Sequence, residues 1–165
     1  MKIINKNIIE AANQEEFDVI VHGCNCFCVQ GGGVAFYMNK EFNTLSFEME
    51  KDVYKGDINK LGTIDYEYLS YEDDRWVKYP DENGRWVTKR LVVVNAYTQY
   101  NYGTDSIKLD YSALRLCFKK INKLFPNSVI GMPKIGCGLA GGDWEVVERI
   151  INQDLTDCTV KVYEI

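Results

Sequence analysis

The chain has 165 residues, of which 46% are hydrophobic and 26% are charged, as in an ordinary globular protein. This length predicts one domain, spanning residues 1–165, with a core of its own. The net charge of −5 argues against binding along a nucleic-acid backbone, which requires a basic surface. No apolar run is long enough to span a membrane and the N-terminus lacks a signal-peptide core, so we expect a cytoplasmic protein. We also expect a monomer.

The first part of the chain is expected to alternate between strands and helices. Residues 2–4 and 17–21 are predicted strands, with a turn or short helix around 8–12 between them. The alternating run 62–70 predicts a half-exposed strand. After three consecutive glycines, apolar residues recur at helical spacing at Val34, Ala35, Met38 and Phe42.

A hairpin is predicted in the middle of the chain. Residues 75–79 and 85–88 flank 80–84, which ends in the Asn-Gly pair typical of a hairpin turn. We expect this aromatic-rich hairpin to project from the body of the protein. The continuous apolar run 91–94 is typical of a buried central strand.

The second part of the chain predicts two helices and two strands. A helix follows from the 3.6-residue spacing of Leu109, Ala113, Leu116, Cys117, Lys120 and Leu124. Residues 129–132 form a buried strand, Asp143 caps the next helix, and 159–165 close the chain as a strand. Strands that alternate with helices predict the α/β class, here a three-layer α/β/α sandwich with a central mixed sheet and an added β-hairpin.

Three of the predicted strands end in loops suited to close backbone contact with a ligand. These loops are residues 22–33, 95–103 and 133–143. Because ligands of open α/β sheets bind beyond the carboxyl ends of the strands, we expect one shared site. The first and third loops are glycine-rich and precede helices, whose N-terminal amides favour a phosphorylated ligand. Two such loops side by side would suit a diphosphate, and ordinary tight turns are the alternative for either loop alone.

The third loop also fits the dinucleotide-binding pattern G-x-G-x-x-G at residues 136–141. That pattern requires a βαβ unit with an acidic residue at the end of its second strand, and normally a large domain beyond. Only one helix and one strand follow here, and Glu164 is the penultimate residue. We therefore reject a dinucleotide-binding fold, and no Gly-Lys-Ser/Thr sequence of a Walker loop is present either.

His22 is the only histidine, and it lies where a strand meets the first loop. It is a candidate for proton transfer near neutral pH, and a core histidine bonded to backbone is the alternative. Cys24, Cys26 and Cys28 follow at alternate positions, but no second ligand pair accompanies them, so we expect no metal. Without a signal peptide, the six cysteines are expected to be reduced.

Other polar and aromatic candidates lie in the loops. Asn25 could hydrogen-bond sugar hydroxyls or stabilise a turn. Asp143 is expected to cap a helix, with catalysis as the alternative. The tyrosines at positions 97, 100 and 102 could stack on a base or sugar, or cover the sheet edge.

The two glycine-rich loops resemble those of macrodomains, the ADP-ribose-binding α/β/α fold. The sequence His22-x-Cys-Asn-Cys…Gly31-Gly-Gly-Val-Ala35 resembles the branch of yeast-type ADP-ribose-1″-phosphate phosphatases. Residues 132–144, Met-Pro-Lys-Ile-Gly-Cys-Gly-Leu-Ala-Gly-Gly-Asp-Trp, resemble the second phosphate loop of that branch and of the related ADP-ribosyl-glutamate hydrolases. The similarity covers the chain apart from residues 76–86.

The resemblance implies a set of site residues. Asn25 would meet the distal ribose, residues 31–35 and 136–141 would hold the diphosphate, and Ile8 would lie near the adenine. The candidate catalytic residues are His22, Asn25 and Asp143. The candidate ligand-binding residues are Asn7, Ile8, Asn25, Gly31, Gly32, Gly33, Val34, Ala35, Asn95, Tyr97, Ile135, Gly136, Cys137, Gly138, Leu139, Ala140 and Gly141.

The sequence departs from the family pattern in three places. Asn7 stands where many macrodomains have an aspartate that reads the adenine amino group. The glutamate-hydrolase branch has a lysine after the central strand, where this chain has residues 95–99 without a lysine. That branch also has an aspartate directly after Gly-Cys-Gly-Leu, where this chain has Ala140. Lysine-based removal of ADP-ribose is therefore not expected.

The resemblance favours an enzyme, a phosphatase that hydrolyses ADP-ribose-1″-phosphate without a cofactor. His22 would act as nucleophile or as general acid. The alternatives are a non-catalytic module that binds ADP-ribose or an ADP-ribosylated partner, a hydrolase of another ADP-ribose linkage, and a scaffold without a nucleotide site.

Overall fold

The sheet of this protein is mixed and carries helices on both faces. The computed structural model describes residues 1–49, 55–78 and 89–165. Within these ranges seven strands pair in the order β1-β7-β6-β2-β5-β3-β4. The first five strands in that order run parallel, and β3 and β4 are antiparallel to their neighbours. The strands are β1 (Lys2–Asn5), β2 (Val19–Asn25), β3 (Ile64–Glu72), β4 (Arg75–Lys78), β5 (Lys89–Gln99), β6 (Val129–Pro133) and β7 (Thr159–Glu164).

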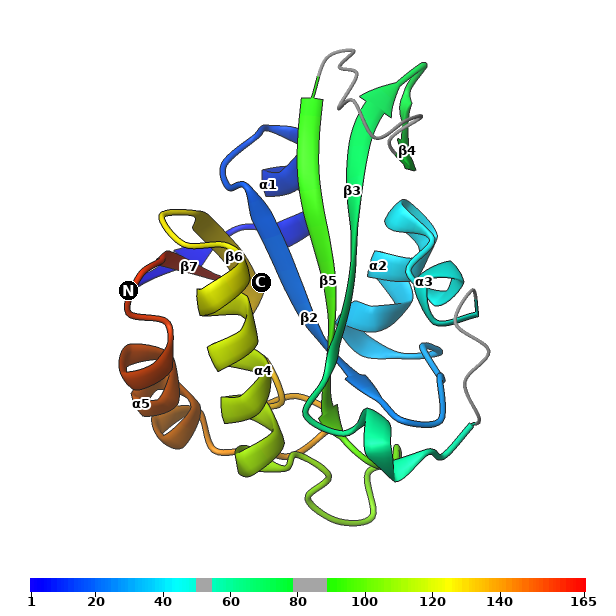
Figure 1. The fold of residues 1–165 in the computed structure, drawn as a ribbon, viewed down its shortest axis with the longest axis vertical. Coiled ribbons are helices and arrows are strands. Elements are labelled where there is room, and N and C mark those ends of the chain that lie inside the picture. The colour runs from blue at the N-terminus through cyan, green and yellow to red at the C-terminus, as the bar shows by residue number, and fades with distance from the viewer. Residues whose placement is uncertain (50–54, 79–88) are drawn as a thin grey trace.

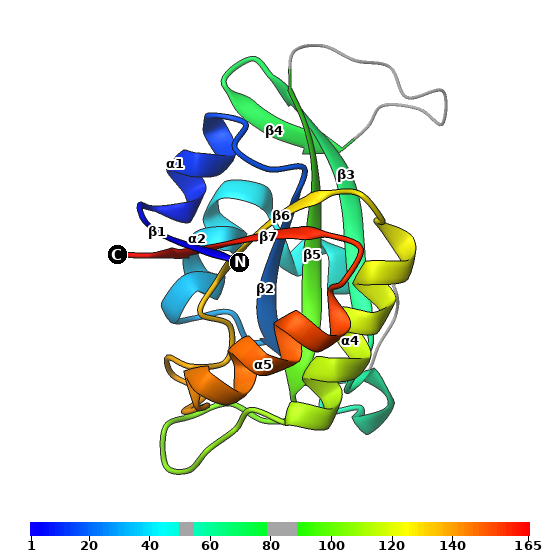
Figure 2. The same cartoon turned by 90° about the vertical axis from the view of Figure 1, so that its left-hand side faces the viewer.

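The helices form the outer layers. They are α1 (Ile8–Asn13), α2 (Gly33–Phe42), α3 (Leu45–Met49), α4 (Tyr111–Leu124) and α5 (Trp144–Asp154), with a short 3₁₀ helix at Ile58–Lys60. Helices α4 and α5 cover one face of the sheet, and α1, α2 and α3 cover the other (Figures 1 and 2). Along β5, Val92 and Val94 pack into the core between the sheet and helices α4 and α5. Leu91 and Val93 pack into the core between the sheet and helices α1, α2 and α3. This double burial explains the continuous apolar run and confirms the predicted three-layer sandwich.

The parallel strands β2 and β5 are longer than their apolar runs suggested. Pairing continues from Val21 opposite Val94 to His22 opposite Asn95 and Cys24 opposite Tyr97. The predicted loops at 22–33 and 95–103 therefore begin later, after Asn25 and Gln99. The strands continue because these polar side chains find buried partners within the fold.

The prediction that the hairpin projects from the body is wrong for residues 75–78 of its first arm. Strand β4 pairs antiparallel with β3, and Trp76 lies opposite Tyr71 on the sheet. The Trp76 ring is buried against Phe42, and its Nε1 donates a hydrogen bond of 3.0 Å to Asn13 Oδ1. Burial of this large ring holds the arm against the body. The predicted turn at 80–84 and the second arm at 85–88 lie outside the described residues.

Helix α4 buries a different face from the one predicted. Leu116 and Leu124 are about half exposed. The buried side chains are Ala113, Leu114, Cys117, Phe118 and Ile121. The predicted and the observed buried faces share Ala113 and Cys117, so the predicted helical period is confirmed. Packing on the sheet decides which side of the helix is buried.

Candidate functional site

A cleft of about 820 Å³ lies at the carboxyl ends of the parallel strands β2, β5, β6 and β7. The carboxyl ends of β2 and β5 are their lower ends in Figure 1. This volume is in the range of small-molecule sites. The predicted site residues that line it are His22, Asn25, Gly31, Gly32, Gly33, Val34, Ala35, Ile135, Gly136, Cys137, Gly138, Leu139 and Ala140. The first and third loops therefore meet at one edge of the sheet, as expected for this class of fold.

The two glycine-rich loops face each other across the cleft. A Cβ atom added to Gly33 would lie 3.2 Å from Leu139 Cδ1, and one added to Gly32 would lie 3.3 Å from the same atom. Gly33 and Gly136 have φ values of +60° and +74°, which favour glycine. Within the third loop, the Gly142 amide donates to the Gly136 carbonyl at 2.7 Å and closes a tight turn. The loops are thus held close enough to contact one small ligand together.

Helix α2 begins differently from three other helices. Asn7, Asp110 and Asp143 cap α1, α4 and α5, each accepting a backbone N–H through its side chain. The N-cap of α2 is Gly32, which makes no such bond. The first amides of α2 therefore lack a capping acceptor, and they carry the positive end of the helix dipole. Since Gly33, Val34 and Ala35 line the cleft, this end of α2 is suited to an anion.

His22 lies at the floor of the cleft, where its side chain is 1% exposed. The Asn95 amide nitrogen donates to the Thr44 carbonyl at 3.0 Å, so Asn95 Oδ1 faces His22 Nε2, 2.6 Å away. Nε2 therefore carries the proton and donates it. Burial lowers the pKa of His22 to about 4, although the hydrogen bond to Asn95 opposes this change. The imidazole is neutral at pH 7 and is thus suited to act as a base or nucleophile rather than as an acid.

Cys24 lies beside this imidazole on the same strand. Its Sγ is 3.5 Å from His22 Nε2 and 3.9 Å from Nδ1. Burial raises the pKa of the Cys24 thiol well above its usual value. An uncharged thiol at this position cannot stabilise an imidazolium, which is consistent with a neutral His22.

The Asn25 side chain stabilises the first loop from within. Its Oδ1 accepts the amides of Phe27 at 3.0 Å and Val29 at 3.2 Å, and its Nδ2 donates to the Val29 carbonyl at 2.8 Å. The turn-stabilising alternative is therefore the contact that the structure contains. Asn25 also lines the cleft, and one N–H of its amide is not used by these bonds.

Asn95 and Tyr97 do not contact the cleft, which corrects the prediction that they bind the ligand from a loop. Both lie within β5 and are fully buried. The Tyr97 hydroxyl lies 2.6 Å from Asp65 Oδ2 and 2.9 Å from Glu48 Oε1. These buried polar partners keep the Tyr97 ring inside the protein.

Four other predicted site residues also lie outside the cleft lining. Asn7 caps α1, and Ile8 is buried in the core. Asp143 caps α5 by accepting the Glu145 amide at 2.9 Å, as predicted for it structurally, and no catalytic contact follows from that position. A Cβ added to Gly141 would lie 3.6 Å from Ile107, so this glycine faces the neighbouring segment.

Comparison with known proteins identifies the fold. No protein-family profile matches the sequence. An uncharacterised 17.5 kDa protein from the tk–vs intergenic region of Enterobacteria phage T4 is 34% identical over 137 residues, which are 81% of this chain and 77% of the phage protein. The chain belongs to the same family as that protein. The solved macrodomain of Mycobacterium tuberculosis DarG superposes with a TM-score of 0.64 at 18% identity, covering 99% of this chain and 97% of the other. This protein has the macrodomain fold.

A second solved structure that contains the same fold is of a protein in complex with ADP-ribose. The Thermosipho africanus DarTG complex with ADP-ribose matches this macrodomain with a TM-score of 0.58 at 17% identity, over 89% of this chain and 38% of the other. The likeness supports the architecture derived from the sheet order and the helix layers.

Several residues that line the cleft of this macrodomain were not predicted as site residues. They are Gly23, Val29, Gln99, Gly103, Thr104, Pro133, Lys134, Tyr163, Glu164 and Ile165. Tyr102, which the sequence offered as a residue that could stack on a base or sugar, also lines the cleft. Tyr163, Glu164 and Ile165 reach the cleft because β7 runs parallel to β6, so its carboxyl end lies at the same edge. The strand at the end of the chain was visible in the sequence, but its neighbours in the sheet were not. Lys134 pairs with Glu164 at 2.7 Å at this end of the cleft.

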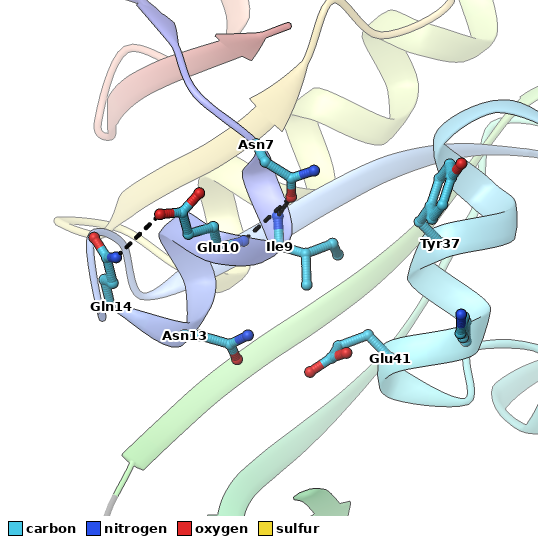
Figure 3. Close-up of a pocket in the computed structure, with 8 residues that line it drawn as sticks. Asn7, Ile9, Glu10, Asn13, Gln14, Tyr37 and Glu41 are labelled. Carbon is cyan, nitrogen blue, oxygen red and sulfur yellow. Dashed lines mark hydrogen bonds between the residues drawn. The ribbon is translucent and has the colours of Figure 1, made fainter.

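A smaller groove of about 430 Å³ lies between α1 and α2 (Figure 3). Asn7 Oδ1 accepts the Ile9 and Glu10 amides there, and Gln14 donates to Glu10. Tyr37 and Glu41 extend from α2 on the opposite side of the groove (Figure 3). The two glycine-rich loops do not line this groove, so Asn7 belongs to a surface separate from the cleft.

All six cysteines of the macrodomain are free thiols. Among the described residues, no group of three or more His, Cys, Asp or Glu side chains gathers as metal ligands would. Within the same ranges, no helix is both long and apolar enough to cross a membrane.

Proposed function

We propose that this macrodomain binds ADP-ribose, free or as part of a derivative, in the cleft between its two glycine-rich loops. The observation that carries this proposal is the N-terminus of α2, which has no side-chain cap and opens into the cleft. Its free amides face the third loop, whose Leu139 lies against Gly32 and Gly33. Two sets of backbone donors on opposite sides of one cleft suit a diphosphate.

The lining of the cleft extends across the ends of four neighbouring strands, β7, β6, β2 and β5, which supports a ligand with a sugar on one side of the diphosphate and a base on the other. Asn25, with its unused amide N–H, would contact the distal ribose. The base would lie at the opposite end, near Tyr163, where Lys134 and Glu164 offer a donor and an acceptor. The complex of Thermosipho africanus DarTG with ADP-ribose supports this choice of ligand, because it has the same fold.

Calorimetric titration tests the proposal. ADP-ribose is expected to bind saturably with one site per chain. AMP is expected to bind at least about tenfold more weakly, since its single phosphate engages only one of the two loops. A protein that binds neither compound, or both equally, would overturn the proposal.

A second candidate function is hydrolysis of ADP-ribose-1″-phosphate, and the state of His22 is the observation that favours it. With its proton on Nε2, the neutral imidazole has an unprotonated Nδ1, the state that a nucleophile requires. Nδ1 would attack the phosphorus and the bond from phosphorus to the 1″ oxygen would break, with water supplying a proton to the departing oxygen. A second water would then release phosphate from the imidazole.

The charges that line the cleft favour binding of ADP-ribose over hydrolysis as the proposed function. In the described lining, the cationic side chain is Lys134, which is paired with Glu164 at the end away from Asn25. Phosphoryl transfer normally depends on cations at the transferred group. Release of phosphate by the wild type but not by His22→Ala would establish the hydrolysis, and equal rates would remove His22 from the mechanism. A wild type that binds ADP-ribose and releases no phosphate would identify a binding module or a hydrolase of another linkage, which assays with O-acyl and side-chain conjugates of ADP-ribose would separate.

A further inference from the structure

The cleft lining includes residues at and after the end of β5, which lies next to β2 on the side away from β6 and β7. The lining of this end is neutral and consists of Val29, Gln99, Tyr102, Gly103 and Thr104. Asp105 and Lys108 lie beside Gly103, but they form an ion pair at 2.9 Å. Among the lining residues that the structure describes, a second phosphate at this end would therefore meet no unpaired cation.

An aromatic cluster supports the Tyr102 side chain, which is 51% exposed. The Phe27 ring lies edge-on to Tyr102 at 6.0 Å and to Tyr100 at 5.1 Å. Phe27 also packs so closely on Gly56 that an added Cβ there would lie 2.9 Å from the ring. The Tyr100 hydroxyl donates to the Gly56 carbonyl at 2.8 Å. The cluster is thus fixed from behind, and an ordered ring loses little freedom when a ligand binds.

We infer that this neutral aromatic end of the cleft is a subsite for a planar heteroaromatic ring joined to C1″ of the distal ribose. The inference rests on the proposed function, because ADP-ribose in the cleft would direct C1″ past Asn25. A planar ring fits an exposed tyrosine by stacking, which needs no charged partner. The favoured ligands are then ADP-ribose derivatives with an N-glycosidic ring, of which NAD⁺ is the simplest, rather than the 1″-phosphate.

The cationic nicotinamide ring of NAD⁺ adds an attraction to the tyrosine face. Because the two anomers of NAD⁺ place this ring on opposite faces of the ribose, the subsite can accept only one of them well. Stacking on an aromatic side chain is expected to improve affinity about tenfold over ADP-ribose for that anomer.

The test is calorimetry on the full chain with ADP-ribose, α-NAD⁺ and β-NAD⁺. One anomer of NAD⁺ should bind about tenfold more tightly than ADP-ribose. Tyr102→Ala should remove this advantage while changing ADP-ribose affinity less than about twofold, and Tyr102→Phe should keep it. The matched control is Tyr37→Ala, since Tyr37 is 60% exposed but lines the groove between α1 and α2 instead.

The results separate this inference from the proposed function. Should ADP-ribose bind while both NAD⁺ anomers bind no more tightly, the aromatic subsite is refuted and the proposed function stands. An equal loss of both ligands in a Tyr102→Ala protein with a native circular dichroism spectrum would also refute it, since Tyr102 would then act on the whole cleft. Absence of ADP-ribose binding to the wild type would instead overturn the proposed function.

Discussion

The neutral state of His22 makes a direct prediction about stability and pH, because this is the only histidine in the chain. Burial lowers its pKa to about 4 in the folded protein, whereas the ordinary value of 6.5 applies to the unfolded chain. Between these two values the unfolded state binds a proton that the folded state does not. The free energy of unfolding therefore rises with pH across this window. The contribution of His22 to that free energy is fully present above about pH 6.5 and is lost as the pH falls toward 4.

The size of the effect follows from the two pKa values. The difference between 6.5 and about 4, at about 1.4 kcal/mol per pKa unit, gives at most about 3 kcal/mol. About 2 kcal/mol of this is lost between pH 7 and pH 5. Glu48 acts in the opposite direction, because burial raises the pKa of its carboxyl, and stability then falls as the pH rises above the ordinary glutamate value. Both the wild type and His22→Gln keep Glu48, so the difference between their pH dependences isolates His22.

Urea unfolding of both proteins from about pH 4.5 to 7.5 measures this difference. The stability of the wild type should fall by about 2 kcal/mol more than that of His22→Gln between pH 7 and pH 5. The single histidine also gives one imidazole signal by NMR, which should titrate near pH 4. Parallel stability curves, or an imidazole that titrates above about pH 6, would refute the assignment of a buried neutral histidine.

Three further substitutions have defined outcomes. Gly138→Ala adds a Cβ with no atom of the protein within 4 Å, so the thermal midpoint should stay unchanged. Calorimetry should show about tenfold weaker binding of ADP-ribose, and an unchanged affinity would exclude the third loop from the site. Gly131→Ala places its Cβ 2.5 Å from the Phe17 ring, so urea unfolding should show a loss of about 1–3 kcal/mol, and a stable variant would contradict this packing. Trp76→Ala removes a ring buried on Phe42 and should cost about 3 kcal/mol in the same assay, whereas a loss near zero would mean that the ring projects into solvent.

Local chemistry in the sequence was enough to predict the fold class and the two glycine-rich loops that line the cleft. The apolar run within β5 indicated a strand buried on both faces, and both cores pack against it. Asp143 was expected to cap a helix, and its side chain accepts the Glu145 amide. Caps, turns and periodicity depend on residues close together in the chain, so they can be read from the sequence.

The contacts that place the His22 and Tyr97 side chains depend on residues far apart in the chain. His22 meets Asn95 across 73 positions, and the Tyr97 hydroxyl reaches Glu48 across 49. These pairs extend β2 and β5 into segments that look like loops, because a polar side chain can be buried only when a distant partner satisfies it.

The order of the strands decides which residues share the cleft. The two glycine-rich loops can be recognised in the sequence, because backbone freedom is a local property of glycine. Only the tertiary structure brought the end of β7 beside β6, which adds Tyr163 and Glu164 to the cleft, and placed the aromatic cluster around Phe27 at the opposite end. Strand order follows from packing between two helix layers, which no short stretch of sequence encodes.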